Sequence, residues 1–224
     1  MEETWGAVFK ILEKWREDLG QAGGEGDPSV TAMAVERKRD PWAVLVSTVL
    51  SLRTKDEVTA AAARALLEKA AGPAELLALG EKETARLIYP AGFYRTKAAN
   101  LQKIAAILLC RYEGCVPPDM EALLALPGVG RKTANLVITE AFGMDGICVD
   151  IHVHRISNRL GWVETESPEK TETALRETLP RQYWKRINAL LVKYGQKICR
   201  PVSPFCSRCA AAGFCPRRGV GKSR

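Results

Sequence analysis

Four cysteines near the C-terminus are spaced so that they could bind a metal ion or a metal cluster. Cys199, Cys206, Cys209 and Cys215 fall within 17 residues, in the pattern C-x6-C-x2-C-x5-C. Four thiolates are enough for one tetrahedral zinc ion or one four-iron cluster, without any ligand from elsewhere. A pair of disulfides is the alternative, and the reducing interior of a cell disfavours it. The residues alone leave zinc and an iron-sulfur cluster open, because both accept four cysteines.

A glycine-rich turn in the middle of the chain is suited to binding a phosphate group. Residues 124–135 read LALPGVGRKTAN, in which one helix ends, a Pro-Gly-Val-Gly turn follows and a second helix begins near Arg131. Gly128 and Gly130 permit backbone conformations and close approaches that other residues prevent. Together with Val129 and Arg131, they are the predicted phosphate contacts, which read no base sequence. A tight turn between helices, with no ligand, is the alternative.

Lys132, in the first turn of the second helix, is the candidate nucleophile. A helix N-terminus and a neighbouring cation such as Arg131 both oppose positive charge, which suits an amine that must attack as the neutral base. Such an amine can attack C1′ of a damaged nucleotide, expel the base and form a Schiff base, after which the strand breaks by β-elimination. A solvated lysine or a plain phosphate contact is the alternative for Lys132 taken alone.

Asp150 stands where a further helix is expected to begin and is the candidate carboxylate partner of the lysine. An aspartate at that position can cap the first N–H groups of the helix. A carboxylate held near an attacking amine could also stabilise the cationic sugar of the transition state and handle protons. Capping and catalysis can coexist in one side chain, and sequence spacing does not show how close the two groups come.

The helix that follows Asp150 carries the only two histidines and two arginines. His152 and His154 are two residues apart and face different directions on a helix, so they cannot form the usual i, i+4 metal pair. They are interpreted as packing residues or phosphate contacts. Arg155 and Arg159, four residues apart, are interpreted as a solvated face or as charge offered to a phosphate or to neighbouring acids.

The elements that must position these groups are predicted to be helices. Glycine and proline punctuate a chain rich in Ala, Leu, Glu, Lys and Arg, with no sustained period-two alternation, so the predicted fold class is all-α. Asp40 and Pro41 predict a helix start, and the apolar run 42–52 predicts a central helix. Trp5, Phe9, Leu12 and Trp15 form one apolar stripe. Helices are expected at 3–19, 42–52, 55–71, 73–78, 82–89, 94–111, 119–125, 131–142, 151–160, 168–178 and 182–196, with a loop at 20–29.

Composition and charge indicate what kind of partner and which cellular compartment to expect. The net charge of +7 favours polyanionic partners without identifying them. No run approaches the roughly 18 apolar residues of a membrane span, so no membrane role is expected. The total of seven cysteines is odd, and the N-terminus lacks the basic-then-apolar order of a secretory signal. We therefore expect an intracellular protein of the cytoplasm or nucleoid, and a monomer.

Together these motifs resemble the endonuclease III family of DNA glycosylases with apurinic/apyrimidinic lyase activity. LPGVGRKTAN is similar to the family's hairpin, whose catalytic lysine falls on Lys132, and VDIHVHRISNRLGW to the segment whose catalytic aspartate falls on Asp150. The cysteine spacing resembles the family's [4Fe-4S] signature, which favours iron over zinc. The resemblance is collinear over most of the chain.

The resemblance implies a two-domain helix-hairpin-helix glycosylase fold. Residues 34–144 would form a six-helix barrel, and residues 1–33 and 145–224 a discontinuous iron-sulfur cluster domain. Damaged double-stranded DNA would lie between the domains, with His152 among its contacts and the damaged nucleotide flipped out to meet Lys132 and Asp150. The implied activity is removal of oxidised pyrimidines through a lysine Schiff base, followed by β-elimination.

Two turns carry the residues expected to enter the DNA. In residues 51–56, SLRTKD, Arg53 stands where many members carry a glutamine that fills the gap left by the flipped base. Arginine could plug that gap and hydrogen-bond the orphaned purine, so this departure leaves base preference open. Phe93, in AGFYRTK, falls where the family has an apolar wedge, and a core phenylalanine is the alternative.

Two alternative functions compete with that of a bifunctional glycosylase and lyase. Monofunctional adenine or thymine mismatch glycosylases share the hairpin, the aspartate and the cluster but lack the lysine, so Lys132 argues against both. A DNA-binding module without catalysis would use the hairpin and the cluster only to grip phosphates. Borohydride trapping separates these classes, because only an imine-forming enzyme becomes covalently attached to DNA.

Overall fold

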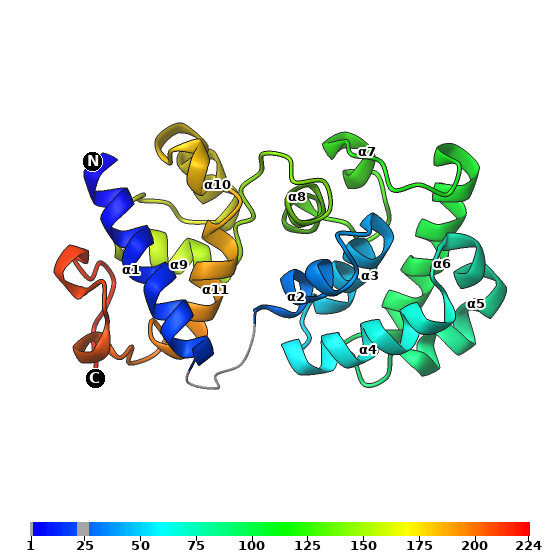
Figure 1. Ribbon diagram of the computed structural model, residues 1–224, viewed down its shortest axis with the longest axis horizontal. Helices are drawn as coiled ribbons and strands as arrows, with labels where there is room; N and C mark the ends of the chain where they lie inside the picture. Colours follow the sequence, from blue (N-terminus) through cyan, green and yellow to red (C-terminus); the bar gives the residue numbers. More distant parts are fainter. Residues whose placement is uncertain (1, 22–26) are drawn as a thin grey trace. The chain divides into compact units, whose positions relative to one another are not determined.

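The chain folds into helices joined by short turns (Figure 1). A computed structural model describes residues 2–21 and 27–224. Within these ranges the elements are α-helices and short 3-10 helices, without a β-strand, so the all-α prediction is confirmed. None of the helices in the described part of the chain is both long and apolar enough to cross a bilayer.

The chain divides into two compact units. The hairpin unit comprises residues 28–144, and the cysteine unit comprises the described residues of Met1–Asp27 together with Asp145–Arg224. The hairpin unit contains α2 (Ser29–Glu36), α3 (Pro41–Ser51), α4 (Asp56–Lys69), α5 (Pro73–Leu87), α6 (Tyr94–Tyr112), α7 (Met120–Leu124) and α8 (Arg131–Glu140). The cysteine unit contains α1 (Glu2–Gln21), α9 (Ile151–Arg159), α10 (Pro168–Thr178), η1 (Arg181–Tyr183), α11 (Ile187–Lys197), η2 (Cys206–Arg208) and η3 (Ala212–Phe214).

Helix α3 is the centre of the hairpin unit, as its apolar sequence predicts. Every residue from 42 to 50 is buried, and the helix packs against α2, α4, α6 and α8. The hydroxyls of Ser47 and Thr48 donate to carbonyl oxygens one turn earlier, both at 2.7 Å, so these polar groups are satisfied inside the core. Asp40 caps the helix by accepting from the N–H groups of the second and third helical residues.

Three features of the hairpin unit differ from the sequence prediction. Helix α2 was not expected; the hydroxyl of Ser29 donates to Asp56 at 2.8 Å, and the helix packs on α3 and α4. The hairpin unit therefore begins at Pro28, whereas the predicted barrel begins at residue 34. Of the loop predicted at 20–29, residues 22–26 lie outside the described residues, while α1 extends through Gln21 and α2 begins at Ser29. The two helices predicted at 73–78 and 82–89 form α5, which is interrupted by the non-helical Gly80.

The cysteine unit has its own aromatic core. The predicted stripe on α1 is confirmed, because Trp5, Phe9 and Leu12 are buried and Phe9 stacks on Tyr183 with ring centroids 4.1 Å apart. Helix α11 lies against α1 and α9 (Figure 1), and α10 packs on α9. The helix predicted at 182–196 is divided into η1 and α11. This packing fixes α9, which Asp150 precedes, against the helix that leads into the cysteine segment.

Candidate functional site

Gly128 and Gly130 have different structural roles in the hairpin. Gly128 has φ +76, in the left-handed region, and a Cβ there would lie 2.5 Å from the side-chain nitrogen of Asn100 on α6. The turn needs glycine at this position for its conformation and for its close packing on α6. Gly130 has φ −98 and precedes α8, and a Cβ there would meet nothing within 4 Å. Gly130 therefore keeps the start of α8 uncovered.

Val129 and Arg131 occupy opposite environments beside these glycines. Val129 is buried, and its N–H donates to the carbonyl oxygen of Leu126 at 3.1 Å. Val129 thus stabilises the turn, and its phosphate contact stays a prediction. Arg131 is exposed at the first position of α8.

Lys132 lies at the edge of the buried part of α8. The lysine is half-buried, and the helix is buried from Thr133 to Thr139. Helix α8 packs on α3 and α7, so the backbone that carries Lys132 is fixed by the core of the hairpin unit. A nucleophile needs such a rigid support together with access to a substrate.

Arg53 and Phe93 come together on the surface of the hairpin unit. The guanidinium carbon of Arg53 lies 5.4 Å from the ring centroid of Phe93, within the range of a cation–π contact. Both residues have left-handed backbone conformations, with φ +51 and +57. Phe93 is 62% exposed, so the alternative of a core phenylalanine is wrong. The structure therefore pairs the two residues predicted to enter the DNA, although they are far apart in sequence.

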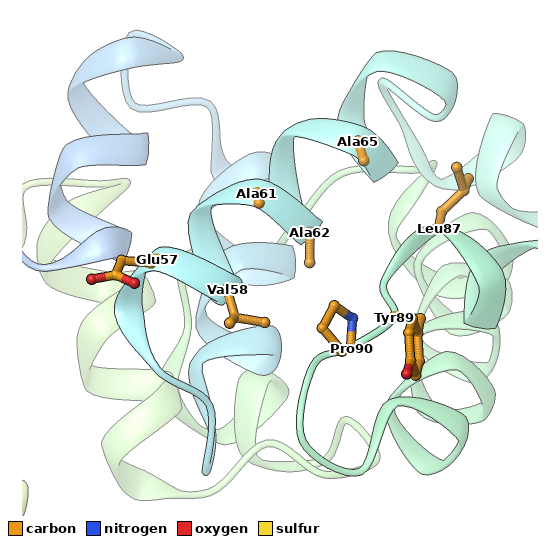
Figure 2. Close-up of a pocket in the computed structure, with 8 residues that line it drawn as sticks. All are labelled: Glu57, Val58, Ala61, Ala62, Ala65, Leu87, Tyr89 and Pro90. Atoms are coloured by element: carbon orange, nitrogen blue, oxygen red, sulfur yellow. The ribbon is translucent and has the colours of Figure 1, made fainter.

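An apolar hollow in the hairpin unit is lined by residues that are near Arg53 and Phe93 in the sequence, but by neither of these two. Figure 2 shows the hollow between α4 and the turn that follows α5. It is lined by Glu57, Val58, Ala61, Ala62, Ala65, Leu87, Tyr89 and Pro90. The exposed candidate DNA contacts Arg53, Phe93 and Gly130 lie instead on the turns after α3, before α6 and before α8.

In the cysteine unit, Asp150 caps α9 as predicted. One carboxylate oxygen accepts from the N–H groups of His152 and Val153, at 2.8 and 2.9 Å. The residue is only 9% exposed. The cap therefore holds the carboxylate in a defined orientation at the positive end of the helix dipole, where negative charge is stabilised.

Arg155 connects the helix behind Asp150 with the cysteine segment. Its Nε and Nη2 donate to the carbonyl oxygen of Cys199 at 3.2 and 3.0 Å, and Nη2 also lies 3.1 Å from Nδ1 of His152. A Cβ on Gly195 of α11 would overlap the ring of His152, so α9 and α11 approach closely there. His152 is half-buried, with its ring beside Gly195, and its DNA contact stays a prediction.

Arg159 has a structural role that the sequence did not indicate. It is 7% exposed, and its Nη1 donates to the sulfur of Cys199 at 3.3 Å and to the carbonyl oxygen of Arg200 at 2.7 Å. Nη2 donates to Pro201 at 2.8 Å. The interpretation of Arg159 as part of a solvated face is therefore wrong, because the cysteine segment folds over the last turn of α9.

The four C-terminal cysteines, Cys199, Cys206, Cys209 and Cys215, are half-buried free thiols. Cys199, Cys209 and Cys215 pack against the core of the unit, and Tyr194 donates to the sulfur of Cys209 at 3.3 Å. Burial raises the pKa of the Cys215 thiol, and the charges of the other three cysteines raise it further. Cys215 is therefore close enough to the other three cysteines to feel their charge, and none of the four forms a disulfide.

This donor set has the chemistry of a metal centre with sulfur ligands. Four half-buried free thiols in one segment, Cys199, Cys206, Cys209 and Cys215, would provide every ligand that a [4Fe-4S] cluster or a single zinc ion needs.

Comparison with known proteins decides the family. Residues 46–181 match the HhH-GPD superfamily of base excision DNA repair proteins. The chain is 47% identical over 191 residues to endonuclease III of Thermotoga maritima, covering 84% of this chain and 90% of that protein. The chain belongs to the endonuclease III family. It is a base excision repair DNA glycosylase with the helix-hairpin-helix fold of that family.

Other endonuclease III proteins agree with this assignment. The chain is 45% identical over 225 residues to endonuclease III homolog 1, chloroplastic, of Arabidopsis thaliana, covering 96% of this chain but 59% of that longer protein. A solved structure of a trapped endonuclease III–DNA covalent intermediate superposes with a TM-score of 0.75 at 36% identity, covering 80% of this chain and 84% of the other.

Proposed function

We propose that this chain is a bifunctional enzyme that removes oxidised pyrimidines from duplex DNA and then cleaves the strand as an apurinic/apyrimidinic lyase. The observation that carries the proposal is Lys132, half-buried in the first turn of α8 beside the uncovered surface at Gly130. The related endonuclease III that was trapped as a covalent intermediate with DNA supports this chemistry. The primary amine of Lys132 is the group that distinguishes a lyase from a monofunctional glycosylase.

Lys132 acts first as a nucleophile. Its neutral Nζ attacks C1′, the glycosidic bond breaks, and the base leaves with the bonding electrons and takes up a proton. Loss of a proton from the amine and opening of the sugar ring give the imine. Removal of a proton from C2′ then expels the 3′ phosphate by β-elimination, and hydrolysis of the imine releases the enzyme.

Asp150 stabilises the cationic sugar while the glycosidic bond breaks. Its carboxylate is oriented by the two N–H groups of the α9 cap, which keep one oxygen in place without neutralising the charge. Lys132 belongs to the hairpin unit and Asp150 to the cysteine unit. The same aspartate therefore caps a helix and takes part in catalysis.

The DNA contacts come from groups with different tasks. Gly130, Arg131 and the first turn of α8 bind a phosphate, which positions the duplex without reading its sequence. Arg53 and Phe93 enter the base stack where the damaged nucleotide leaves it, and His152 contributes a further contact. The net charge of +7 strengthens binding to any DNA in a salt-dependent way. We expect the monomer to be the active form.

The cysteines Cys199, Cys206, Cys209 and Cys215 bind a [4Fe-4S] cluster. When bound, the cluster cross-links the segment after α11, and its thiolates carry charge that suits the guanidinium of Arg159. Through Arg155 and Arg159, the folded cysteine segment supports the helix that Asp150 caps. No step of base release or strand cleavage passes through these residues.

Borohydride trapping tests the proposed function. The holoenzyme is incubated with duplexes that contain an abasic site or an oxidised pyrimidine, alongside Lys132→Ala and the control Lys103→Ala, which removes an exposed lysine on α6. We expect covalent adducts on both duplexes with the wild type and the control, and none with Lys132→Ala. Base release without an adduct would indicate a monofunctional glycosylase. Binding without base release would indicate a DNA-binding module.

A further inference from the structure

A second lysine of the hairpin unit is buried beneath the turn that carries Arg53. Lys97, on α6, is 5% exposed. Its Nζ donates to the carbonyl oxygens of Leu50 and Leu52 at 2.7 and 2.6 Å, and to the hydroxyl of Thr54 at 2.8 Å. An ammonium has three donors, and each of the three has one acceptor here. Lys97 therefore ties α6 to the end of α3 and to the turn that follows it.

The same turn is held from its other side by the segment that carries Phe93. The hydroxyl of Thr54 accepts from the N–H of Gly92 at 3.1 Å as well as from Lys97. A Cβ on Gly92 would overlap the carbonyl oxygen of Arg53, so the two turns approach as closely as their backbones allow. Lys97, Thr54 and Gly92 thus form a clamp between the turn after α3 and the turn before α6.

The clamp adjoins Arg53 and Phe93, two exposed residues of left-handed conformation. Arg53 lies between Leu52 and Thr54, both of which accept from Lys97, and Phe93 directly follows Gly92. A left-handed backbone is unfavourable for arginine and phenylalanine, so the surrounding contacts must hold it. The clamp holds both residues in this state, with their side chains 5.4 Å apart.

We propose that Lys97 is a positioning residue that preorganises the Arg53–Phe93 pair for insertion into the DNA duplex. This inference rests on the proposed function, in which that pair enters the base stack. Residues that are already ordered lose less conformational entropy when they bind. The clamp therefore lowers the cost of opening the duplex at a lesion, while the chemistry at Lys132 does not depend on it.

The test compares substrates that need duplex opening with a substrate that does not. Lys97→Met removes the three donors and keeps the length of the side chain, and Lys103→Met is the control on the exposed face of the same helix. Emission of 2-aminopurine placed opposite an abasic-site analogue reports insertion. We expect Lys97→Met to lose most of the emission change and to raise KM on lesion-containing duplex about tenfold. Trapping on single-stranded abasic DNA should stay at the level of the control.

Two further variants keep the test valid if Lys97→Met does not fold. Thr54→Val removes the hydroxyl shared by Lys97 and Gly92, and Gly92→Ala forces the two turns apart. Either variant should also lose most of the 2-aminopurine emission change, in a protein whose melting temperature shows that it is folded. A normal emission change in folded Thr54→Val and Gly92→Ala would overturn the proposal.

A double-mutant cycle separates positioning from general stability. If Lys97 acts through Arg53, Lys97→Met should have little further effect on duplex binding in an Arg53→Ala background. Fully additive losses would overturn the proposal. Failure of the proposed function would give a different result. In that case the wild type itself would form no adduct, even on single-stranded abasic DNA, whichever result the clamp variants gave.

Discussion

Arg155 donates two hydrogen bonds to the main-chain carbonyl oxygen of Cys199, at 3.2 Å from Nε and 3.0 Å from Nη2. The acceptor belongs to a predicted cluster ligand, and the donor stands five residues after Asp150 on the helix that this aspartate caps. The position of α9 is therefore linked to the folding of the cysteine segment.

Arg155→Lys should weaken this link while keeping the positive charge. A lysine cannot make the paired contacts of a guanidinium, so we expect slower base release, by about tenfold, from enzyme that retains its cluster. Single-turnover rates measured beside the visible absorbance check this expectation. Wild-type rates in Arg155→Lys would show that the paired hydrogen bonds have no part in holding α9.

Asp150→Asn should separate the two roles of the aspartate. An asparagine oxygen can still accept from the N–H groups of His152 and Val153, so the free energy of unfolding should change by less than about 1 kcal/mol. Loss of the charge should slow base release by orders of magnitude, because the cationic sugar loses its stabilisation. Thermal melts measure the effect on stability, and single-turnover assays measure the rate of base release. An unchanged rate of base release would show that Asp150 only caps the helix.

Cys206→Ser should cost the cluster and destabilise the segment after α11. A serine hydroxyl is a poor substitute for a thiolate ligand, so we expect loss of visible absorbance and of about four iron atoms per chain. Cys110→Ser is the matched control, because Cys110 is exposed and lies in the hairpin unit. Full iron content in Cys206→Ser would contradict the assignment of Cys206 as a ligand.

The hairpin glycines should respond differently to alanine. Gly128→Ala places a Cβ at φ +76 and against Asn100, and should cost about 1–2 kcal/mol of unfolding free energy. Gly130→Ala meets open space, so its effect on stability should stay within about 1 kcal/mol while its methyl group weakens DNA binding. Denaturant unfolding and binding titrations distinguish the two. Equal losses of unfolding free energy in Gly128→Ala and Gly130→Ala would disprove the different roles of the two glycines.

Burial of Lys97 should make stability depend on pH. Burial lowers the pKa of Lys97 from 10.5 to about 8, so between these values the unfolded chain binds more protons than the folded one. Stability then rises with pH across this window, and below pH 8 the full cost of burying the charge is present. Relative to Lys97→Met, the wild type should gain up to about 3 kcal/mol from pH 8 to 10.5. The check is denaturant unfolding of both proteins across this pH range. If their free energies of unfolding changed with pH by the same amount, a lowered pKa of Lys97 would be excluded.

The sequence by itself determined the features that depend on neighbours within a helical turn or two. The all-α class, the start of α3 at Asp40 and the cap at Asp150 follow from local chemistry, and the structure confirms them. The cysteine spacing and the hairpin string likewise pointed to the family. Such signals are readable because partner and residue are only a few positions apart.

Only the tertiary structure decided which distant residues meet. Arg159 is buried against Cys199, 40 residues away, and Lys97 bonds to acceptors 43 to 47 residues away. A solvated arginine and a buried one look alike in sequence, because long side chains satisfy their polar groups in either place. The pairing of Arg53 with Phe93 arises in the same way, since two turns become neighbours only when α3 and α6 pack together.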